Sequence, residues 1–435
     1  MENEIIGLIG LGILVVLLVL RFPIGIALIL VSFGGIYVMI GSRPAWGILS
    51  AIPYDFAAKW TLSSVPMFLL MGFICYHAGL TKSLFDACRS WMARVPGGLA
   101  IASVVGSAGF AAVTGSSVAC AAAMGRIAVP EMIAKRYDAA LATGTIAAAG
   151  TLGALIPPSI LLILFGVFAE VPIGKLFIGG VGAGLLTAFA YIMVIYIRAK
   201  LNPKLAPPLD APPPLSERLA HLAETWPIIA ILVVVIGGIF VGFFTATEAG
   251  AIGAFASIVI SMIKGSLTRE AFWNAIKETL TTTGALFLIA VGANLLTRFL
   301  ALSGSGELIA SSVLGLEADP LMLILGISLL YLLLGMFLDP LGAMLLTLPV
   351  MLPVLERSHV DLIWFGVYLV KFLEIGMITP PIGLNVFVIK GVVGNLASLT
   401  TIFRGIMWFL MADAVVVALL IAFPGIITFL PNMMQ

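Results

Sequence analysis

The stretch GALIPP at residues 153–158 decides the fold, because it returns as GMITPP at residues 376–381. The second proline pair begins 223 residues after the first, from Pro157 to Pro380. The same offset aligns TGSS at 114–117 with FLDP at 337–340, and Pro130 with Pro353. Each half therefore carries a polar, helix-breaking tip, a single proline and a proline pair within apolar sequence. Interruptions at matching positions of two apolar halves are typical of the binding site of a secondary transporter.

Composition predicts an all-α polytopic membrane protein. Of the 435 residues 61% are hydrophobic and 10% are charged, with a mean hydropathy of +1.20, whereas a soluble domain has roughly 25% charged residues. The net charge of +1 gives no indication of a nucleic-acid partner. Cys75, Cys88 and Cys120 are scattered without metal-ligand spacing. They are interpreted as apolar packing residues, and no cofactor is expected.

Hydropathy predicts two halves of similar organisation. Two apolar regions, about 97–133 and about 321–355, are interrupted near their middles, and each arm is too short to cross a bilayer. We interpret them as two re-entrant helical hairpins. The two proline pairs break the apolar spans at about 139–168 and about 362–390. Further spans are predicted near 5–20, 24–41, 62–79, 176–198, 227–243, 247–263, 281–300 and 405–430, with an interfacial connection at 301–320.

These features divide the chain into a first repeat over 1–200, a proline-rich cytoplasmic linker over 201–226 and a second repeat over 227–435. Placing residues 82–94 and 135–136 in the cytoplasm puts most basic residues on that side, which predicts that both termini are periplasmic. The first hairpin then enters from the cytoplasm and the second from outside. The two repeats are thus inverted, which is the symmetry that alternating access requires.

Both interruptions are candidate cation sites. The first tip offers hydroxyl groups at Thr114, Ser116 and Ser117, although a face of small residues that packs helices together is an alternative interpretation. The matching break at the proline pair favours the ion site. Each proline pair removes backbone donors, so that freed carbonyls of Gly153, Ile156, Gly376 and Thr379 become available to a hard cation such as Na⁺.

Two ionisable residues near the second tip have competing interpretations. Asp339 lies within an apolar region, where a carboxylate requires an ion, a proton or a basic partner. The alternative is a carboxylate that caps backbone donors. Arg298 closes the span before the second hairpin. It suits bidentate capture of a substrate carboxylate, or it extends its charged end to the membrane interface.

Other polar residues within spans carry weaker signals. Lys371 and Glu374 lie three residues apart, which favours a mutual pair on one helix face. Asp413 fits either a proton site or a hydrogen bond to a neighbouring helix. Asn294 and Asn385 fit either a polar pathway or bridges between helices.

These motifs resemble those of the large membrane subunit of TRAP transporters (tripartite ATP-independent periplasmic, DctM type). The resemblance covers essentially the whole chain. It rests on TGSSVA at 114–119, VPEM at 129–132, GTLGALIPPS at 150–159, DP at 339–340 and ITPPIG at 378–383.

The resemblance implies a bacterial inner-membrane protein of the ion-transporter superfamily. Hairpins and broken helices would form a transport domain that moves like an elevator against a scaffold. The implied partners are a small four-helix membrane subunit and a periplasmic protein that binds and delivers an organic acid, with Na⁺ as the driving ion. The expected function is therefore sodium-coupled uptake of a small organic anion, without enzymatic activity.

Carrying the family's sites onto this chain places one sodium at Thr114, Ser116, Gly153, Ile156 and Pro158, with Ser117 beside them. A second sodium falls near Gly335, Asp339, Gly376, Thr379 and Pro381. Arg298 and Asp339 would face the substrate. The first tip opens with threonine where the family often has serine, so the hydroxyl group is retained.

Three alternatives remain open. A sodium/divalent-anion symporter of related fold would transport without a binding protein. An intramembrane protease using Ser116 or Ser117 would need a positioned base, and no His or Lys stands at tip depth. A channel would also show paired broken spans, but with fast, diffusive flux.

Overall fold

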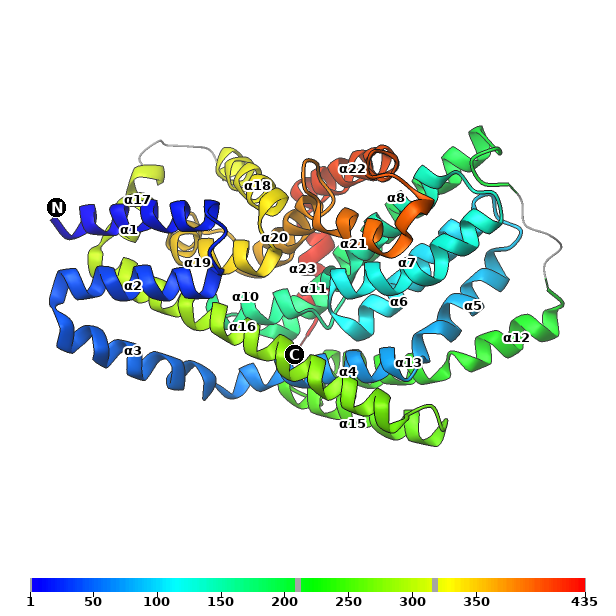
Figure 1. The fold of residues 1–435 in the computed structure, drawn as a ribbon, viewed down its shortest axis with the longest axis horizontal. Helices are drawn as coiled ribbons and strands as arrows, with labels where there is room; N and C mark the ends of the chain where they lie inside the picture. Colours follow the sequence, from blue (N-terminus) through cyan, green and yellow to red (C-terminus); the bar gives the residue numbers. More distant parts are fainter. Residues whose placement is uncertain (1, 208–212, 315–319, 435) are drawn as a thin grey trace.

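The computed structural model describes residues 2–207, 213–314 and 320–434, and within these ranges the chain is helical without a strand (Figure 1). Among these residues, eight helices are long and apolar enough to cross a membrane. This confirms the prediction of an all-α, multi-pass membrane protein. The eight are Trp60–His77, Ser117–Ala134, Ala139–Phe168, Ile173–Leu201, Ala246–Ile263, Arg269–Ser303, Pro340–Arg357 and Leu399–Ala422. Ser117–Ala134 and Pro340–Arg357 are the second arms of the predicted hairpins, so the prediction that each arm is too short to cross a bilayer was wrong for these two.

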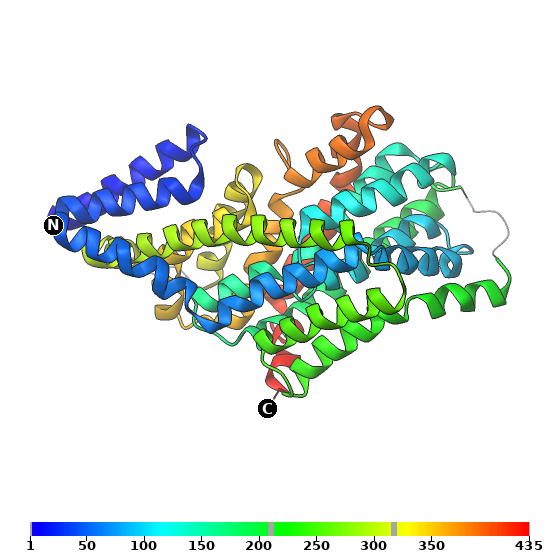
Figure 2. The same ribbon diagram turned by 60° about the horizontal axis from the view of Figure 1, so that its bottom comes forward.

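The N-terminal helices form one end of the molecule. They are α1 (Glu2–Val19), α2 (Ile24–Ile40) and α3 (Ser42–Ala57), followed by a short 3₁₀ turn (Trp60–Ser63) and α4 (Ser64–His77). Helix α2 packs along α16 (Arg269–Ser303), and α4 packs along α15 (Ala246–Ile263). Figure 2 shows α16 as one long helix that crosses much of the molecule. Helix α3 was not predicted, because its charged ends and two prolines keep its hydropathy low.

The first interrupted region forms two antiparallel arms and a broken span. Helix α5 (Leu80–Met92) leads into α6 (Gly98–Thr114), which packs against α7 (Ser117–Ala134). The chain then continues as α8 (Ala139–Gly150), the short α9 (Leu152–Leu155) and α10 (Ile160–Phe168). Residues 156–159 around the proline pair are non-helical. The long α11 (Ile173–Leu201) closes this part of the chain.

The second interrupted region repeats this element order. Its helices are α18 (Pro320–Phe337), α19 (Pro340–Arg357), α20 (Leu362–Gly376), α21 (Leu384–Val393), α22 (Leu399–Ala422) and α23 (Gly425–Asn432). Three boundaries keep the 223-residue offset: α6 ends at Thr114 and α18 at Phe337, α7 begins at Ser117 and α19 at Pro340, and α8 begins at Ala139 and α20 at Leu362. Both proline pairs contain a cis peptide bond.

Several boundaries differ from the sequence prediction. The proline-rich linker is partly helical, because α12 (Leu215–Glu224) lies within it and meets the Trp226–Phe240 segment at 44°. That segment consists of α13 (Trp226–Leu232), a π-helical turn (Val233–Gly237) and α14 (Gly238–Phe240). Residues 208–212 of the linker lie outside the described residues. The last predicted span, 405–430, instead ends at Ala422, because Pro424 cannot continue the helical hydrogen bonds.

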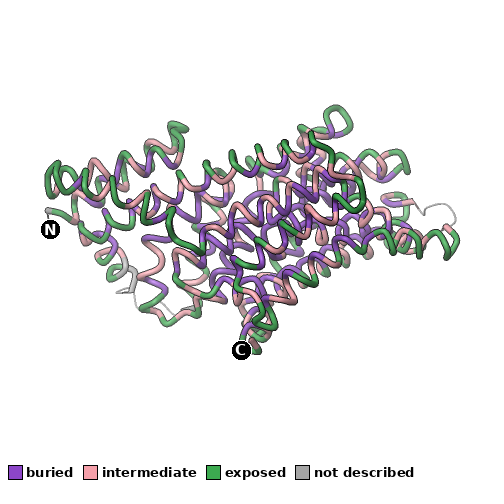
Figure 3. The backbone as a smooth tube through the Cα atoms, turned by 90° about the horizontal axis from the view of Figure 1, so that it is seen from below, coloured by how far each residue is buried: buried purple, intermediate pink, exposed green. Residues whose placement is uncertain are grey.

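The predicted interfacial connection at 301–320 contains α17 (Ser305–Leu314), and residues 315–319 are outside the described part of the chain. The deepest burial lies in the middle of the molecule, where the broken spans meet (Figure 3). Ala139–Phe168 is the most deeply buried of the eight spans. The first break is therefore enclosed by other helices, as non-helical backbone at membrane depth must be, whereas Pro381 and Ile382 of the second break are exposed.

Candidate functional site

The first tip is a tight turn between α6 and α7. Gly115 has a φ of +61°, a left-handed conformation that glycine adopts without steric cost. Ser116 caps α7, since its Oγ accepts a hydrogen bond from the Ala119 N–H at 3.4 Å. The Thr114 hydroxyl donates to the Phe110 carbonyl at 3.1 Å and is buried.

This tip packs backbone against backbone on the break of the first half. A Cβ atom on Gly115 would lie 2.4 Å from the Pro158 carbonyl oxygen, and one on Gly153 would lie 2.6 Å from the Ser116 carbonyl oxygen. Ser159 caps α10 and also donates to the Ala154 carbonyl. The structure thus places the backbone of the first tip, at Gly115 and Ser116, against the backbone of the first break, at Gly153 and Pro158.

The second tip is built on Asp339. Its Oδ1 accepts hydrogen bonds from the Leu341 and Gly342 N–H groups, both at 3.1 Å, and so caps α19. The capping interpretation is therefore correct in geometry, and it leaves a role toward an ion or substrate open. Gly335 on α18 and Gly376 at the end of α20 are in backbone contact, because a Cβ on Gly376 would lie 2.6 Å from the Gly335 Cα.

A cavity of about 130 Å³ lies between the two tips. Gly115, Ser116 and Ser117 line it from the first tip, and Asp339 lines it from the second. The broken spans contribute the rest of the wall, and Glu374 on α20 is part of it. Residues that carry hydroxyl and carboxylate groups therefore line one small, mostly apolar cavity from both halves, and oxygen ligands of this kind suit a hard monovalent cation.

Glu374 and Lys371 do not form the mutual pair that their spacing favours. Lys371 instead makes an ion pair with Asp413 on α22, with 2.5 Å between Nζ and Oδ1, and both side chains are 1% exposed. Neither Glu374 oxygen has a hydrogen-bond partner of good geometry, although the Ser117 hydroxyl interacts with this carboxylate. The prediction of a Lys371–Glu374 pair was wrong because α22 packs against α20 and places the Asp413 carboxylate beside the Lys371 ammonium group.

The Asp413 carboxylate also connects to the first half. The Tyr191 hydroxyl on α11 donates to it, at 2.9 Å to Oδ1 and 3.0 Å to Oδ2. The same hydroxyl lies 3.3 Å from the hydroxyl of Thr151, at the start of the first break. Of the two interpretations of Asp413, the structure bears out bonding to neighbouring helices.

Contacts at the base of the first hairpin explain part of the VPEM segment. Glu131 on α7 pairs with Arg89 on α5. In the turn after α7, the Tyr137 hydroxyl accepts a hydrogen bond from the Leu99 N–H at 3.3 Å, and burial raises the pKa of Tyr137. These contacts tie both arms of the hairpin at the end opposite its tip.

Some predicted site residues lie apart from the cavity between the tips. Arg298 is exposed on α16 and does not line it. Thr379 donates to the Ile375 carbonyl at 2.6 Å, and Pro381 is exposed. Ile156 contacts α11 near Gly184. The roles assigned to these residues stay predictions.

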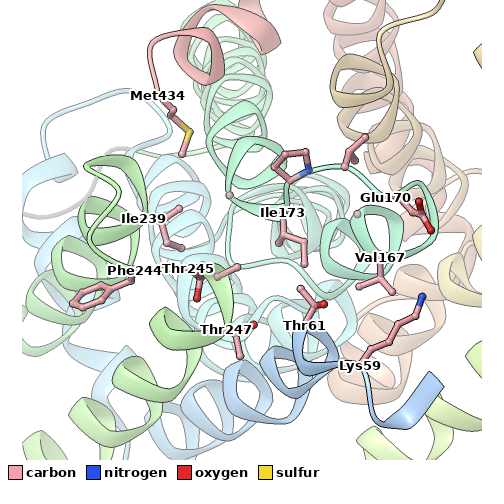
Figure 4. A pocket seen from close by; sticks show the side chains of 15 residues that line it. Lys59, Thr61, Val167, Glu170, Ile173, Ile239, Phe244, Thr245, Thr247 and Met434 are labelled. Carbon is pink, nitrogen blue, oxygen red and sulfur yellow. The ribbon is translucent and has the colours of Figure 1, made fainter. Parts of the chain in front are cut away.

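Two larger cavities share Lys59 and Glu170. The first, of about 690 Å³, is lined by the segments before α4, after α10 and before α15 and by Met434 near the C-terminus (Figure 4). The second, of about 370 Å³, extends to Asn294, Thr297 and Glu356. Asn294 therefore faces a cavity, which favours the pathway interpretation for this residue. The four segments that line the first cavity all belong to the side of the membrane that the sequence predicts to be periplasmic.

Comparison with known proteins adds to this geometry. Residues 11–426 match the family described as the tripartite ATP-independent periplasmic transporter, DctM component. The chain belongs to this family. It is 33% identical over 400 residues to the C4-dicarboxylate TRAP transporter large permease protein DctM of Pseudomonas aeruginosa, with 92% of each chain covered.

A second DctM-family relative is the sialic acid TRAP transporter large permease protein SiaM of Vibrio cholerae. It is 30% identical over 434 residues, which cover 100% of this chain and 99% of that one. The fold is similar to the crystal structure of the Alcanivorax borkumensis YdaH transporter, with a TM-score of 0.60 at 15% identity over 88% of this chain and 90% of that chain. The chain is thus a TRAP-type large permease, a multi-pass membrane component of a secondary transporter.

Proposed function

We propose that this DctM-family chain takes up a small organic anion across the bacterial inner membrane, driven by Na⁺. Two relatives carry C4-dicarboxylates or sialic acid in their names, and both are carboxylic acids. The family description supports a small membrane subunit and a periplasmic binding protein as partners. The binding protein would deliver the acid to the face that holds the two larger cavities.

The observation that carries the proposal is the cavity between the tips. Ser116, Ser117, Asp339 and Glu374 face it from two halves of the chain. A cation bound there would neutralise negative charge beside the anion site and fix the two tips relative to each other. The anion would then bind well only when the cation is present, which is how a binding equilibrium couples two solutes.

The helices around the breaks are proposed to move together as a transport domain. In the first half, a backbone contact joins Ser116 of the tip to Gly153 of the break. In the second half, a backbone contact joins Gly335 of α18 to Gly376 at the end of α20. Polar bonds connect Asp413 with Lys371 and Tyr191. Helices α1–α4 and α13–α16 would form the scaffold. Inverted repeats that exchange conformations would open the site first to one side and then to the other.

Reconstitution with both partners tests the coupling. Proteoliposomes that contain the chain and the small subunit are supplied with loaded binding protein outside, and uptake is followed with an inward gradient of Na⁺ or of K⁺. Saturable uptake that requires Na⁺ is expected. Equal uptake with K⁺ would refute the sodium coupling, and unsaturable flux would indicate a channel.

The same vesicles separate the tripartite system from a symporter that works alone. When the binding protein is omitted, uptake is expected to fall at least tenfold. Undiminished uptake of the free acid would favour the alternative symporter without a binding protein.

A further inference from the structure

Of the two acidic residues that line the cavity between the tips among the described residues, Asp339 accepts backbone hydrogen bonds and Glu374 does not. Its side chain is 1% exposed, and neither oxygen has a hydrogen-bond partner of good geometry among the described residues. A buried carboxylate in this situation is costly unless a cation or a set of donors accompanies it. Because Glu374 also lines the cavity between the tips, its position indicates that it binds a ligand there.

The charged and polar groups around Glu374 do not supply that partner. Lys371 lies one turn away on the same helix, but its ammonium group contacts Asp413 on α22. Ser117 and Cys120 approach from α7, and Tyr191 lies on α11 with its hydroxyl turned to Asp413. Lys371 and Asp413 neutralise each other, so Lys371 is not available as the counterion of Glu374.

Asp339 brings a second carboxylate to the same cavity from the opposite tip. An anion that enters this cavity would therefore meet an acidic residue from each half of the chain, unless a cation accompanies it. The described residues contain no group of three His, Cys, Asp or Glu side chains that could hold a metal ion. Hydroxyl oxygens together with a single close carboxylate suit a hard monovalent cation better than a transition metal.

We propose that the Glu374 carboxylate is a direct ligand for the coupling cation at the first tip, beside Ser116 and Ser117. This inference rests on the proposed sodium coupling. A residue of the second half would thus complete the ion site of the first half. The cation would remove the charge that otherwise repels the substrate anion, so that Glu374 makes anion binding depend on the cation.

The test is Na⁺-dependent thermal stability of the purified full-length chain, because a ligand of the folded state raises Tm by mass action. Wild-type protein is titrated with NaCl at constant total NaCl plus KCl. Glu374→Gln is expected to weaken the apparent Na⁺ affinity by about tenfold or more, as the loss of a charge-assisted contact does. It is also expected to raise Tm in Na⁺-free buffer, because an unpaired buried charge is removed. Glu224→Gln, at an exposed residue of α12, is the control and should match wild type.

The outcomes separate this inference from the proposed function. An absent Na⁺ response in wild type would count against sodium coupling as a whole and would overturn this inference with it. A normal response in wild type that Glu374→Gln retains in full would overturn only the role of Glu374.

A second measurement uses wild-type protein and covers the case in which the variant does not fold. Infrared difference spectra with and without Na⁺ are expected to show a shifted carboxylate band. If Na⁺ perturbs no carboxylate band, or if the only change is in a protonated carboxyl band, Glu374 does not ligate the cation as an anion.

Discussion

At the residue scale, four polar side chains in the apolar interior form one connected network of polar contacts. Lys371 contacts Asp413, Asp413 accepts from Tyr191, and the Tyr191 hydroxyl lies beside that of Thr151. This network extends from Thr151, at the break of the first half, to Lys371 on α20, the helix that carries Glu374. Such a network stabilises the fold only while every member is present, because a lone buried charge is costly.

Breaking the ion pair is therefore expected to be strongly destabilising. Lys371→Met or Asp413→Asn leaves one buried group without its partner and should cost about 3–5 kcal/mol of unfolding free energy. The double variant should lose much less than the sum of the two. Unfolding in mixed micelles measures all three, and additive losses would show that the pair is not coupled.

Gly115 joins two requirements in one residue, a φ of +61° and an approach to the Pro158 carbonyl. Gly115→Ala should displace the first tip and reduce uptake at least tenfold while the protein still inserts, since a Cβ atom has no room there. Gly12→Ala is the control, because a Cβ atom at Gly12 meets nothing within 4 Å. Comparable uptake by the two variants would show that the tip tolerates displacement.

At the scale of elements, caps and close contacts set where helices start and how near they come. Asp339 begins α19 as its cap, and Ser116 and Ser159 do the same for α7 and α10. These three helices therefore each have a side chain that satisfies first-turn N–H groups, whereas α21 begins after Gly383 without a side-chain cap. These caps are readable from the sequence, because each stands directly after an interruption of the apolar pattern.

Asp339 allows capping and charge to be separated. Asp339→Asn keeps a capping side chain, whereas Asp339→Ala also removes the cap at a cost of about 1 kcal/mol. Both variants are expected to abolish uptake and to leave membrane insertion intact, with only Asp339→Ala lowering Tm. Wild-type uptake rates in Asp339→Asn would remove the charge of Asp339 from the mechanism.

Helices α8 and α22 meet through glycines. A Cβ atom on Gly405 would lie 1.9 Å from the Ala140 carbonyl oxygen. Gly405→Ala must push the helices apart and should destabilise the protein by about 1–3 kcal/mol. Gly391→Ala on α21, where a Cβ atom has open space, should remain near wild type. Equal Tm values for the two variants would contradict the close contact.

For the whole molecule, the sequence predicts the positions of the interruptions well and their partners poorly. The 223-residue offset locates both tips and both breaks to within a residue or two of the observed helix ends. Helix α12 is missed because the prolines before it dominate the composition of the linker. The partner of Lys371 is missed because Asp413 lies 42 residues away, and only packing brings α20 and α22 together.

The arrangement of cavities makes the proposed orientation testable. Lys59 and Glu170 line the same large cavity (Figure 4), whereas Arg218 and Lys264 belong to segments predicted to be cytoplasmic. In a Cys88→Ser background, Lys59→Cys and Glu170→Cys should react with a membrane-impermeant thiol reagent added to intact cells. Arg218→Cys and Lys264→Cys should react only after lysis. The reverse pattern would invert the topology.

The length of α16 has a consequence for the surrounding lipid. Its 35 residues correspond to about 52 Å at 1.5 Å per residue, while the hydrocarbon layer is about 30 Å thick. The charged first turns, with Arg269, Glu270 and Lys277, must then stand in water, and the apolar remainder lies obliquely among the acyl chains. A thicker or thinner bilayer would change that inclination. Helices α2 and α19 pack against α16. A change in acyl-chain length that tilts α16 would therefore also shift α19, which begins at the second tip.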